Sequence, residues 1–186
     1  YLNCPMTKDE YDAFYAALLD GASRLPGVEA AGLSSRDLAR GWTFDFANAV
    51  LLDPGNGPVK GISVSGSASG DYFKVVGLDL IQGREFVAAD RRDIPGVAIV
   101  TKRMASQLFD GAALGRSLHV STGFRGAPQA DLQIVGIVES PVDLSGEEVS
   151  AIFFPSSFPS PIQLGTARTL HVRSKGPAAV LAPAIR

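Results

Sequence analysis

The segment from residue 132 to residue 138 constrains the fold most, because it is apolar on both of its faces. Side chains alternate between the two faces of a strand, so Ile134 and Val138 fall together on one face. Val135 and Ile137 then share the other face. A strand with no polar face must be covered on both sides. We therefore expect this segment to be a central strand of a sheet.

The clearest helix is predicted over residues 8–25. Thr7 and Glu10 have the spacing of a capping box, in which each residue satisfies an amide at the start of the helix. Pro26 and Gly27 should end the helix. The apolar side chains recur at helical spacing and predict one broad buried face; they are Tyr11, Phe14, Tyr15, Leu18, Leu19, Ala22 and Leu25.

The rest of the chain predicts short strands with few helices. Ser69 has the position of a cap for a short helix that Gly77 ends, and Thr101 has the position of a cap for a helix that Asp110 and Gly111 end. A last helix is expected near Pro177. This pattern indicates an α+β fold. The predicted strands are 28–34, 41–53, 59–67, 78–82, 97–100, 118–120, 132–138, 151–154 and 169–172.

Composition excludes several classes of protein. Apolar residues make up 46% of the 186 residues and charged residues 19%, which supports one folded domain or two small lobes. The formal net charge of -2 leaves no basic excess for binding nucleic acid. The single cysteine, Cys4, excludes a disulfide framework. No apolar run approaches the roughly 20 residues of a membrane helix, and the chain starts at Tyr1, so we expect a soluble piece of a larger or processed protein.

Residues that could carry chemistry are few. His119 and His171 lie between apolar neighbours on predicted strands, so both should point away from the core as solvated side chains. A role as ligand or general base is the open alternative. Cys4 has no histidine near it in the sequence and is expected to be an incidental thiol. Neither a phosphate-binding loop of the G-x-x-x-x-G-K-[ST] type nor a G-x-S-x-G motif occurs.

Three surface features allow more than one interpretation. The alternating aromatic residues Trp42, Phe44 and Phe46 are either core or an exposed binding patch. The loop around Phe158 is rich in proline and could be accessible to a partner. Residues 90–93 are expected to form a solvated loop with weak ion pairs. The residues alone indicate an α+β domain without recognisable catalytic groups.

A resemblance to a known family adds what these patterns do not supply. Residues 69–86 read SGDYFKVVGLDLIQGREF, which resembles the signature of the MacB-like periplasmic core domains of ABC transporter permeases in the MacB/FtsX superfamily. Further matches follow in the family's order at residues 14–29, 97–116, 134–138, 152–155 and 170–186. The chain is most similar to the duplicated orphan permeases. It departs from the family pattern between Phe109 and Leu114, where a proline is missing, and again over residues 139–143.

The resemblance implies a two-lobed α+β fold. Residues 1–68 and 165–186 would form a porter-like lobe, and residues 69–164 would form a strand-rich middle lobe of the kind called Sabre. Signature glycines would permit turns and close backbone approaches, and aromatic residues would supply packing. We expect no catalytic residue, no cofactor and no metal. The residues expected to act structurally are Tyr72, Phe73, Gly77, Gly83, Arg84, Phe86, Gly115 and Gly136.

The implied function is mechanical. In this family the movement of a cytoplasmic ATPase passes through membrane helices to the extracytoplasmic domain, in efflux or in transport of envelope components. The implied partners are the membrane helices of the same permease, a separate ABC ATPase subunit, and a second permease copy or a periplasmic adaptor, with no nucleic acid. The implied location is the periplasmic side of the inner membrane.

Two other functions stay open. A secreted or periplasmic hydrolase would use Asp71, His119 or His171 in a cleft between the lobes, with a histidine and a carboxylate at hydrogen-bonding distance. A small-ligand binding domain would have a preformed apolar pocket.

The resemblance also leads to two expectations about the chain's surroundings. The full gene should encode an apolar helix of about 20 residues on each side of this domain. The family's first strand would lie upstream of Tyr1, and a sheet edge left without it would be open to pairing with a neighbouring chain.

Overall fold

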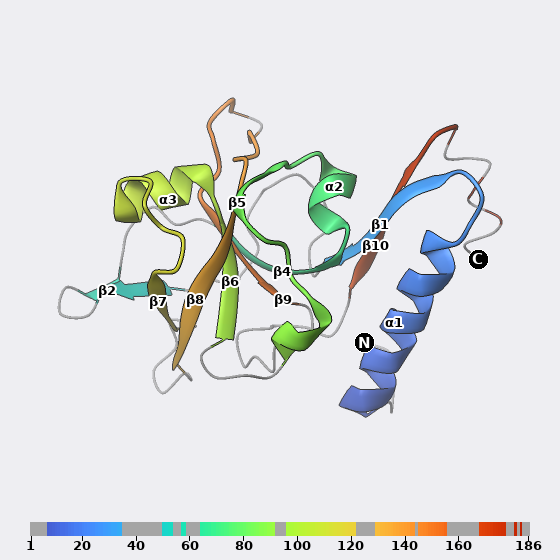
Figure 1. Cartoon of the computed structure of the whole chain (residues 1–186), viewed down its shortest axis with the longest axis horizontal. Coiled ribbons are helices and arrows are strands. Elements are labelled where there is room, and N and C mark those ends of the chain that lie inside the picture. The colour runs from blue at the N-terminus through green and yellow to red at the C-terminus, as the bar shows by residue number, and fades with distance from the viewer. Residues whose placement is uncertain are drawn as a thin grey trace.

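The computed structural model describes residues 7–34, 50–53, 57–58, 64–91, 96–121, 129–143, 145–155 and 168–177, together with Leu181 and Pro183. The described part contains α1 (Lys8–Ser23), α2 (Tyr72–Val76), α3 (Lys102–Phe109) and the 3-10 turn η2 (Ala88–Arg91). Its strands are β1 (Val28–Ser34), β2 (Val50–Asp53), β3 (Gly57–Pro58), β4 (Val64–Gly70), β5 (Leu80–Gly83), β6 (Gly96–Thr101), β7 (Ser117–Ser121), β8 (Gln129–Val138), β9 (Ala151–Pro155) and β10 (Thr169–Ser174). The predicted α+β class is confirmed (Figure 1).

All of these strands belong to one mixed sheet. The order is β10-β1-β4-β9-β6-β8-β7-β2-β3, and β5 pairs with β8 beside the end of β7. The pairs β4·β9 and β6·β8 are parallel, and the other pairs are antiparallel. The central position predicted for residues 132–138 is correct, because β8 has β6 on one side and β7 and β5 on the other.

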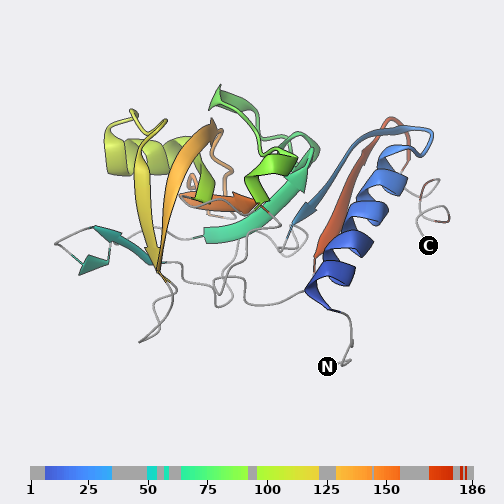
Figure 2. The ribbon, with the colours of Figure 1, turned by 60° about the horizontal axis from the view of Figure 1, so that its bottom comes forward.

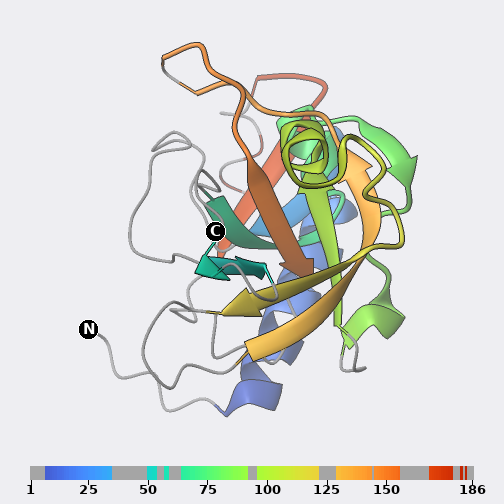
Figure 3. The same ribbon diagram turned by 90° about the vertical axis from the view of Figure 1, so that its left-hand side faces the viewer.

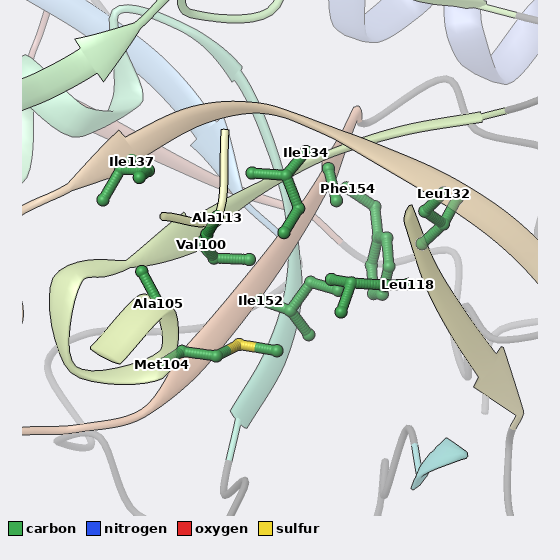
Figure 4. Packing of buried hydrophobic residues seen from close by; sticks show 11 residues of the cluster. Val100, Met104, Ala105, Ala113, Leu118, Leu132, Ile134, Ile137, Ile152 and Phe154 are labelled. Atoms are coloured by element: carbon green, nitrogen blue, oxygen red, sulfur yellow. The ribbon is translucent and has the colours of Figure 1, made fainter. Parts of the chain in front are cut away.

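Two apolar cores lie on opposite faces of the central strands. Alternate residues of β6 and β9 divide between them, so that Val100 and Ile152 pack in one core and Ile99 and Phe153 pack in the other. The first core lies under α3 and includes its residues Met104 and Ala105. Figure 3 shows that α3 follows β6 directly. Figure 4 shows how Met104 of α3 points into this core. The second core contains the buried residues of α2.

A bulge in β8 changes which of its side chains share a face. The register against β6 shifts between Ala98 and Ile99, so that Ile99 lies opposite Gly136. As a result Ile134 packs in the core under α3, whereas Val138 packs in the core of α2. The expectation that these two residues share a face is wrong, because strict alternation does not survive an extra residue in a strand.

The helix α1 begins as predicted. The Glu10 N–H donates to the Thr7 hydroxyl at 3.3 Å, and the Thr7 N–H donates to the Glu10 carboxylate at 2.7 Å. The pKa of the Glu10 carboxyl lies below its usual value. The main cause is the hydrogen bond from the Thr7 backbone N–H, and the bond from the Thr7 hydroxyl adds to it. The expected buried face is partly wrong, because Phe14 is 52% exposed and rests edge-on against Tyr15.

The next two helices show one wrong cap and one correct cap. Ser69 is not a cap, because it lies within β4 and α2 starts only after Asp71. Gly77 ends α2 in the left-handed conformation, as predicted. Thr101 caps α3 as predicted, accepting from the Met104 N–H at 3.5 Å. The same hydroxyl donates to the Val149 carbonyl at 3.1 Å. It therefore also links the start of α3 to the segment that precedes β9.

The described sheet falls into two parts of unequal size. Helix α1 lies along β1 and β10, and we call these three elements the outer part (Figures 1 and 2). The remaining strands and α3 form the main part. Its strand β4 pairs with β1 and so joins the two parts. Strands β2 and β3 pair at the far end of the main part, although the expected boundary at residue 68 groups them with the porter-like lobe. The division into lobes stays a prediction.

Several predictions lie outside the described residues. These are the aromatic residues Trp42, Phe44 and Phe46, the loop around Phe158, Cys4, residues 59–63 and most of the helix after Pro177. In the described part of the sheet β10 has a neighbour on one side only. Pairing of an edge with another chain stays a prediction.

The bulge makes Gly136 a position that cannot accept a side chain. A Cβ there would collide with the carbonyl oxygen of Arg84, which is backbone and cannot swing away. We expect Gly136→Ala to lower the free energy of unfolding by about 1–3 kcal/mol through overpacking. Gly21→Ala is the matched control, because a Cβ at this position of α1 meets nothing within 4 Å. It should raise stability by up to about 1 kcal/mol. Urea unfolding of the two variants measures both effects, and equal stability would contradict the account of the bulge.

Candidate functional site

The segment over residues 69–86 crosses the joint between the two parts of the sheet. It begins in the last residues of β4, continues through α2 and β5, and ends at Phe86. Tyr72 and Phe73 of α2 are 1% and 2% exposed. Both side chains therefore lie inside the molecule and are unavailable to a ligand in solution.

The aromatic rings around α2 form a continuous chain of contacts, which we call the aromatic seam: His171, Tyr72, Phe153, Phe73 and Phe86. The centre of the Tyr72 ring lies 5.6 Å from the centre of the His171 ring of β10 and 6.1 Å from the centre of the Phe153 ring of β9. The Phe73 ring lies 5.0 Å from Phe153 and 6.4 Å from Phe86. These separations are those of favourable tilted and edge-to-face pairs. The seam thus connects a strand of the outer part with a strand of the main part.

Gly32 of β1 lets α2 approach the sheet at this seam. A Cβ built at Gly32 would lie 2.5 Å from the Cα and 2.6 Å from the N of Tyr72. Sequence analysis did not single out Gly32, since it lies in an apolar strand with no turn signal beside it. A glycine inside a buried strand is, however, a recognised sign of close backbone approach.

Two of the signature glycines, Gly83 and Gly115, pack the backbone against β8. Gly83 has a φ of 78°, and a Cβ there would collide with the Val135 carbonyl oxygen. The same carbonyl accepts a hydrogen bond from the Arg84 N–H at 3.0 Å. Gly115, with a φ of 78°, donates its N–H to the Ile134 carbonyl at 2.8 Å. The backbone of the signature is therefore packed directly on the bulged part of β8.

Arg84 forms a two-pronged ion pair with Asp90. Its two guanidinium nitrogens donate to the two carboxylate oxygens at 2.7 and 2.8 Å, and the Val87 N–H donates to the same carboxylate at 2.8 Å. The Asp90 side chain is only 7% exposed. The hydrogen bond from Arg84 holds the pKa of Asp90 below its usual value. The expectation of a solvated side chain is therefore wrong for Asp90, and residues 92 and 93 lie outside the described chain.

His119 pairs with a carboxylate on the neighbouring strand. It lies opposite Asp131 in the β7·β8 register, and its Nδ1 is 2.7 Å from the Asp131 carboxylate. The Asp131 side chain is 68% exposed and the His119 side chain 30%. A pair so open to water contributes no more than about 1 kcal/mol. One criterion of the hydrolase hypothesis, a histidine beside a carboxylate, is thus met on an open strand surface.

His171 is not the solvated residue that the sequence predicts. It is partly buried between β1 and α2, with its Nε2 3.0 Å from the hydroxyl of Ser34 and its ring edge-on to Tyr72. Ser34 is 1% exposed. The prediction failed because the face of β10 that carries His171 is covered by α2 rather than by water.

The two histidines of the hydrolase hypothesis are not brought together. His171 lies on β10 and His119 on β7, and β1, β4, β9, β6 and β8 separate these strands in the sheet. Asp71 is exposed at the start of α2. Within the described ranges no three His, Cys, Asp or Glu side chains are grouped to hold a metal ion. Among the same residues no helix is long and apolar enough to span a bilayer.

Arg168, next to the start of β10, adds side-chain contacts with α1 to the β1·β10 ladder. Its guanidinium lies 3.5 Å from the carboxylate of Asp12 and 5.5 Å from the centre of the Tyr15 ring. Its backbone N–H donates to the Tyr15 hydroxyl at 3.3 Å. The Arg168 side chain is 10% exposed. These contacts tie the last described strand to the first helix.

Comparisons with known proteins give one family match and two similar folds. The sequence matches the family profile described as the MacB-like periplasmic core domain over residues 5–182. The fold is similar to the periplasmic region of MacB from Actinobacillus actinomycetemcomitans, with a TM-score of 0.59 and 16% identity over 91% of this chain and 70% of that chain. It is also similar to the extracellular domain of the noncanonic ABC-type transporter YknZ from Gram-positive bacteria, with a TM-score of 0.50 and 17% identity over 96% of this chain and 83% of that chain. No curated protein matches the sequence.

The Arg84–Asp90 pair predicts a specific dependence of stability on pH. Because the pKa of Asp90 is lower in the folded chain, the pair stabilises the fold above the unfolded pKa of aspartate. This stabilisation is lost as the pH falls through the folded pKa. We expect Asp90→Asn to cost about 1 kcal/mol at pH 7, since Arg84 is partly exposed, and progressively less below about pH 5. Unfolding free energies of the two proteins across this range test it, and parallel profiles would contradict the assignment.

Proposed function

The chain belongs to the family of MacB-like periplasmic core domains of ABC transporter permeases, and from this premise we propose that it transmits movement mechanically. The movement originates in ATP binding and hydrolysis on a separate cytoplasmic ATPase subunit. It reaches this domain through membrane helices of the same full-length permease. In this proposal the domain works outside the inner membrane and catalyses no reaction.

The observation that carries the proposal is the tie between α1 and β10. These elements come from opposite ends of the chain, yet Arg168 binds Asp12 and Tyr15 at once. Membrane helices that preceded α1 and followed β10 would therefore act on one body. A push on that body is resisted by packed side chains, because protein interiors are close-packed and deform little.

The contacts between the outer and main parts support the same function. The aromatic seam joins β10 to β9 through the buried ring of Tyr72. Movement of the outer part should then carry the main part with it, as in rigid-body transitions of other proteins. In this proposal the outer part corresponds to the porter-like lobe and the main part to the Sabre-like lobe. A second permease copy or a periplasmic adaptor would receive the movement, in efflux or in transport of an envelope component.

The absence of catalysis is part of the proposal. The His119–Asp131 pair is the arrangement in the described chain that most resembles catalytic groups. Asp131 lies largely in water, where its carboxylate gains little from the protein's own dipoles. A hydrolase would need a nucleophile and a water-excluding cavity at this pair.

The test uses the full-length permease with its ATPase. A spin label at Gln107, exposed on α3, is paired with the same label on the second permease copy, and the distance is measured without nucleotide, with a non-hydrolysable ATP analogue and after hydrolysis. We expect the distance to change between these states. Identical distributions in all three would contradict mechanical transmission.

Two variants connect this movement to the proposed tie. Arg168→Gln removes the charge that binds Asp12 and should reduce the nucleotide-dependent change in distance. Arg24→Gln is the matched control, because Arg24 is exposed at the end of α1 and its ion pair is with Asp20 of the same helix. An equal effect of the two substitutions would contradict a specific role for the α1–β10 tie.

A further inference from the structure

Few backbone pairs connect the outer part with the main part. Strands β1 and β4 share three residue pairs, Gly32 with Gly70, Leu33 with Ser69, and Ser34 with Ala68. On the other side of β4, residues 64–68 pair with β9. Ala68 is thus the residue at which the sheet passes from one part to the other.

The side chains of β4 add little to this joint. Its sequence is VSGSASG, and the three residues that pair with β1 are alanine, serine and glycine. Small side chains bury little apolar area, so they contribute little packing energy. A ladder of three pairs in which Leu33 is the one large residue is expected to twist and splay easily.

Helix α2 lies across the joint. We propose that Tyr72 is the coupling residue that makes the outer and main parts move as one body. Its ring contacts His171 of the outer part on one side and Phe153 of the main part on the other. Its side chain is 1% exposed, so any rotation of one part against the other would have to displace a fully packed ring.

The position of Tyr72 is fixed by two main-chain contacts with β1. Gly32 permits its backbone to rest on β1, where a Cβ would come within 2.5 Å of the Tyr72 Cα. The Asp71 N–H donates to the Ala31 carbonyl at 3.0 Å, which fastens the start of α2 to the same strand. The ring is therefore held at the joint by main-chain contacts as well as by packing.

His171 is oriented toward the coupling residue by Ser34. The Ser34 hydroxyl and the His171 Nε2 are 3.0 Å apart, and Ser34 is itself paired with Ala68 in the β1·β4 ladder. The imidazole ring is thus held against the Tyr72 ring, with the two ring planes at 70°. Outer-part movement reaches the Tyr72 ring through this hydrogen-bonded pair.

This inference deepens the proposed function, on which its role in transport rests. The coupling itself is tested on the 186-residue chain alone. In a Cys4→Ser background, Ala17→Cys on α1 and Gln107→Cys on α3 place spin labels on exposed positions of the two parts. The width of the inter-label distance distribution then reports how firmly the parts are joined.

The expected results distinguish the effect of losing the Tyr72 ring from the effect of any substitution at this position. With Tyr72 intact the distribution should be narrow, and Tyr72→Ala should widen it about twofold or more, because the joint then opens locally. Tyr72→Phe keeps the ring and should leave the width unchanged. A folded Tyr72→Ala protein with an unchanged width would overturn the inference, as would a broad distribution in the parent protein.

A second variant decides the case in which Tyr72→Ala does not fold. His171→Leu removes the ring contact on the outer side of Tyr72 and leaves the Tyr72–Phe153 contact in place. It should also widen the distribution, and an unchanged width would refute the coupling. A narrow width in the isolated chain together with no nucleotide-dependent movement in the full permease would leave the coupling standing and overturn the proposed function.

Discussion

The close contact between the start of α2 and Gly32 of β1 is the constraint on which the arrangement of the molecule depends. It allows a five-residue helix to place Tyr72 and Phe73 where the two parts of the sheet meet. Without this approach, the outer part would be joined through three pairs of the β1·β4 ladder. The sheet is continuous in its hydrogen bonding, but its stiffness at the joint comes from side chains of α2. Close packing at Gly32 therefore determines how firmly the outer and main parts of the domain are joined.

Local signals in the sequence predicted much of the fold. The cap at Thr7, the cap at Thr101 and the left-handed end at Gly77 depend on residues within a few positions of one another, and all three are present. The two cores could not be assigned correctly because the bulge opposite Ile99 shifts the alternation of β8. At this bulge the backbone of Arg84, from a distant part of the chain, donates a hydrogen bond to Val135. Periodicity alone carries no information about that contact.

The candidate site was less accessible to sequence reasoning than the helices were. Family resemblance pointed to Tyr72, Phe73 and the signature glycines, but their role as structural residues stays a prediction. The pairs Arg84–Asp90 and Ser34–His171 were missed, since each depends on how distant segments meet. His171 shows the reason most clearly: its sequence context is that of any exposed strand residue, and only the covering helix makes it part of the joint.

The central claim is that the outer and main parts form one cooperative body. Native-state hydrogen exchange tests it most directly, because it reports the free energy at which each segment opens. Amides of β1 and β10 should become exposed only with the same large opening that exposes β8 and β9, with one shared dependence on urea. Exchange of β1 and β10 through a separate opening of lower free energy, while β8 stays protected, would contradict the account.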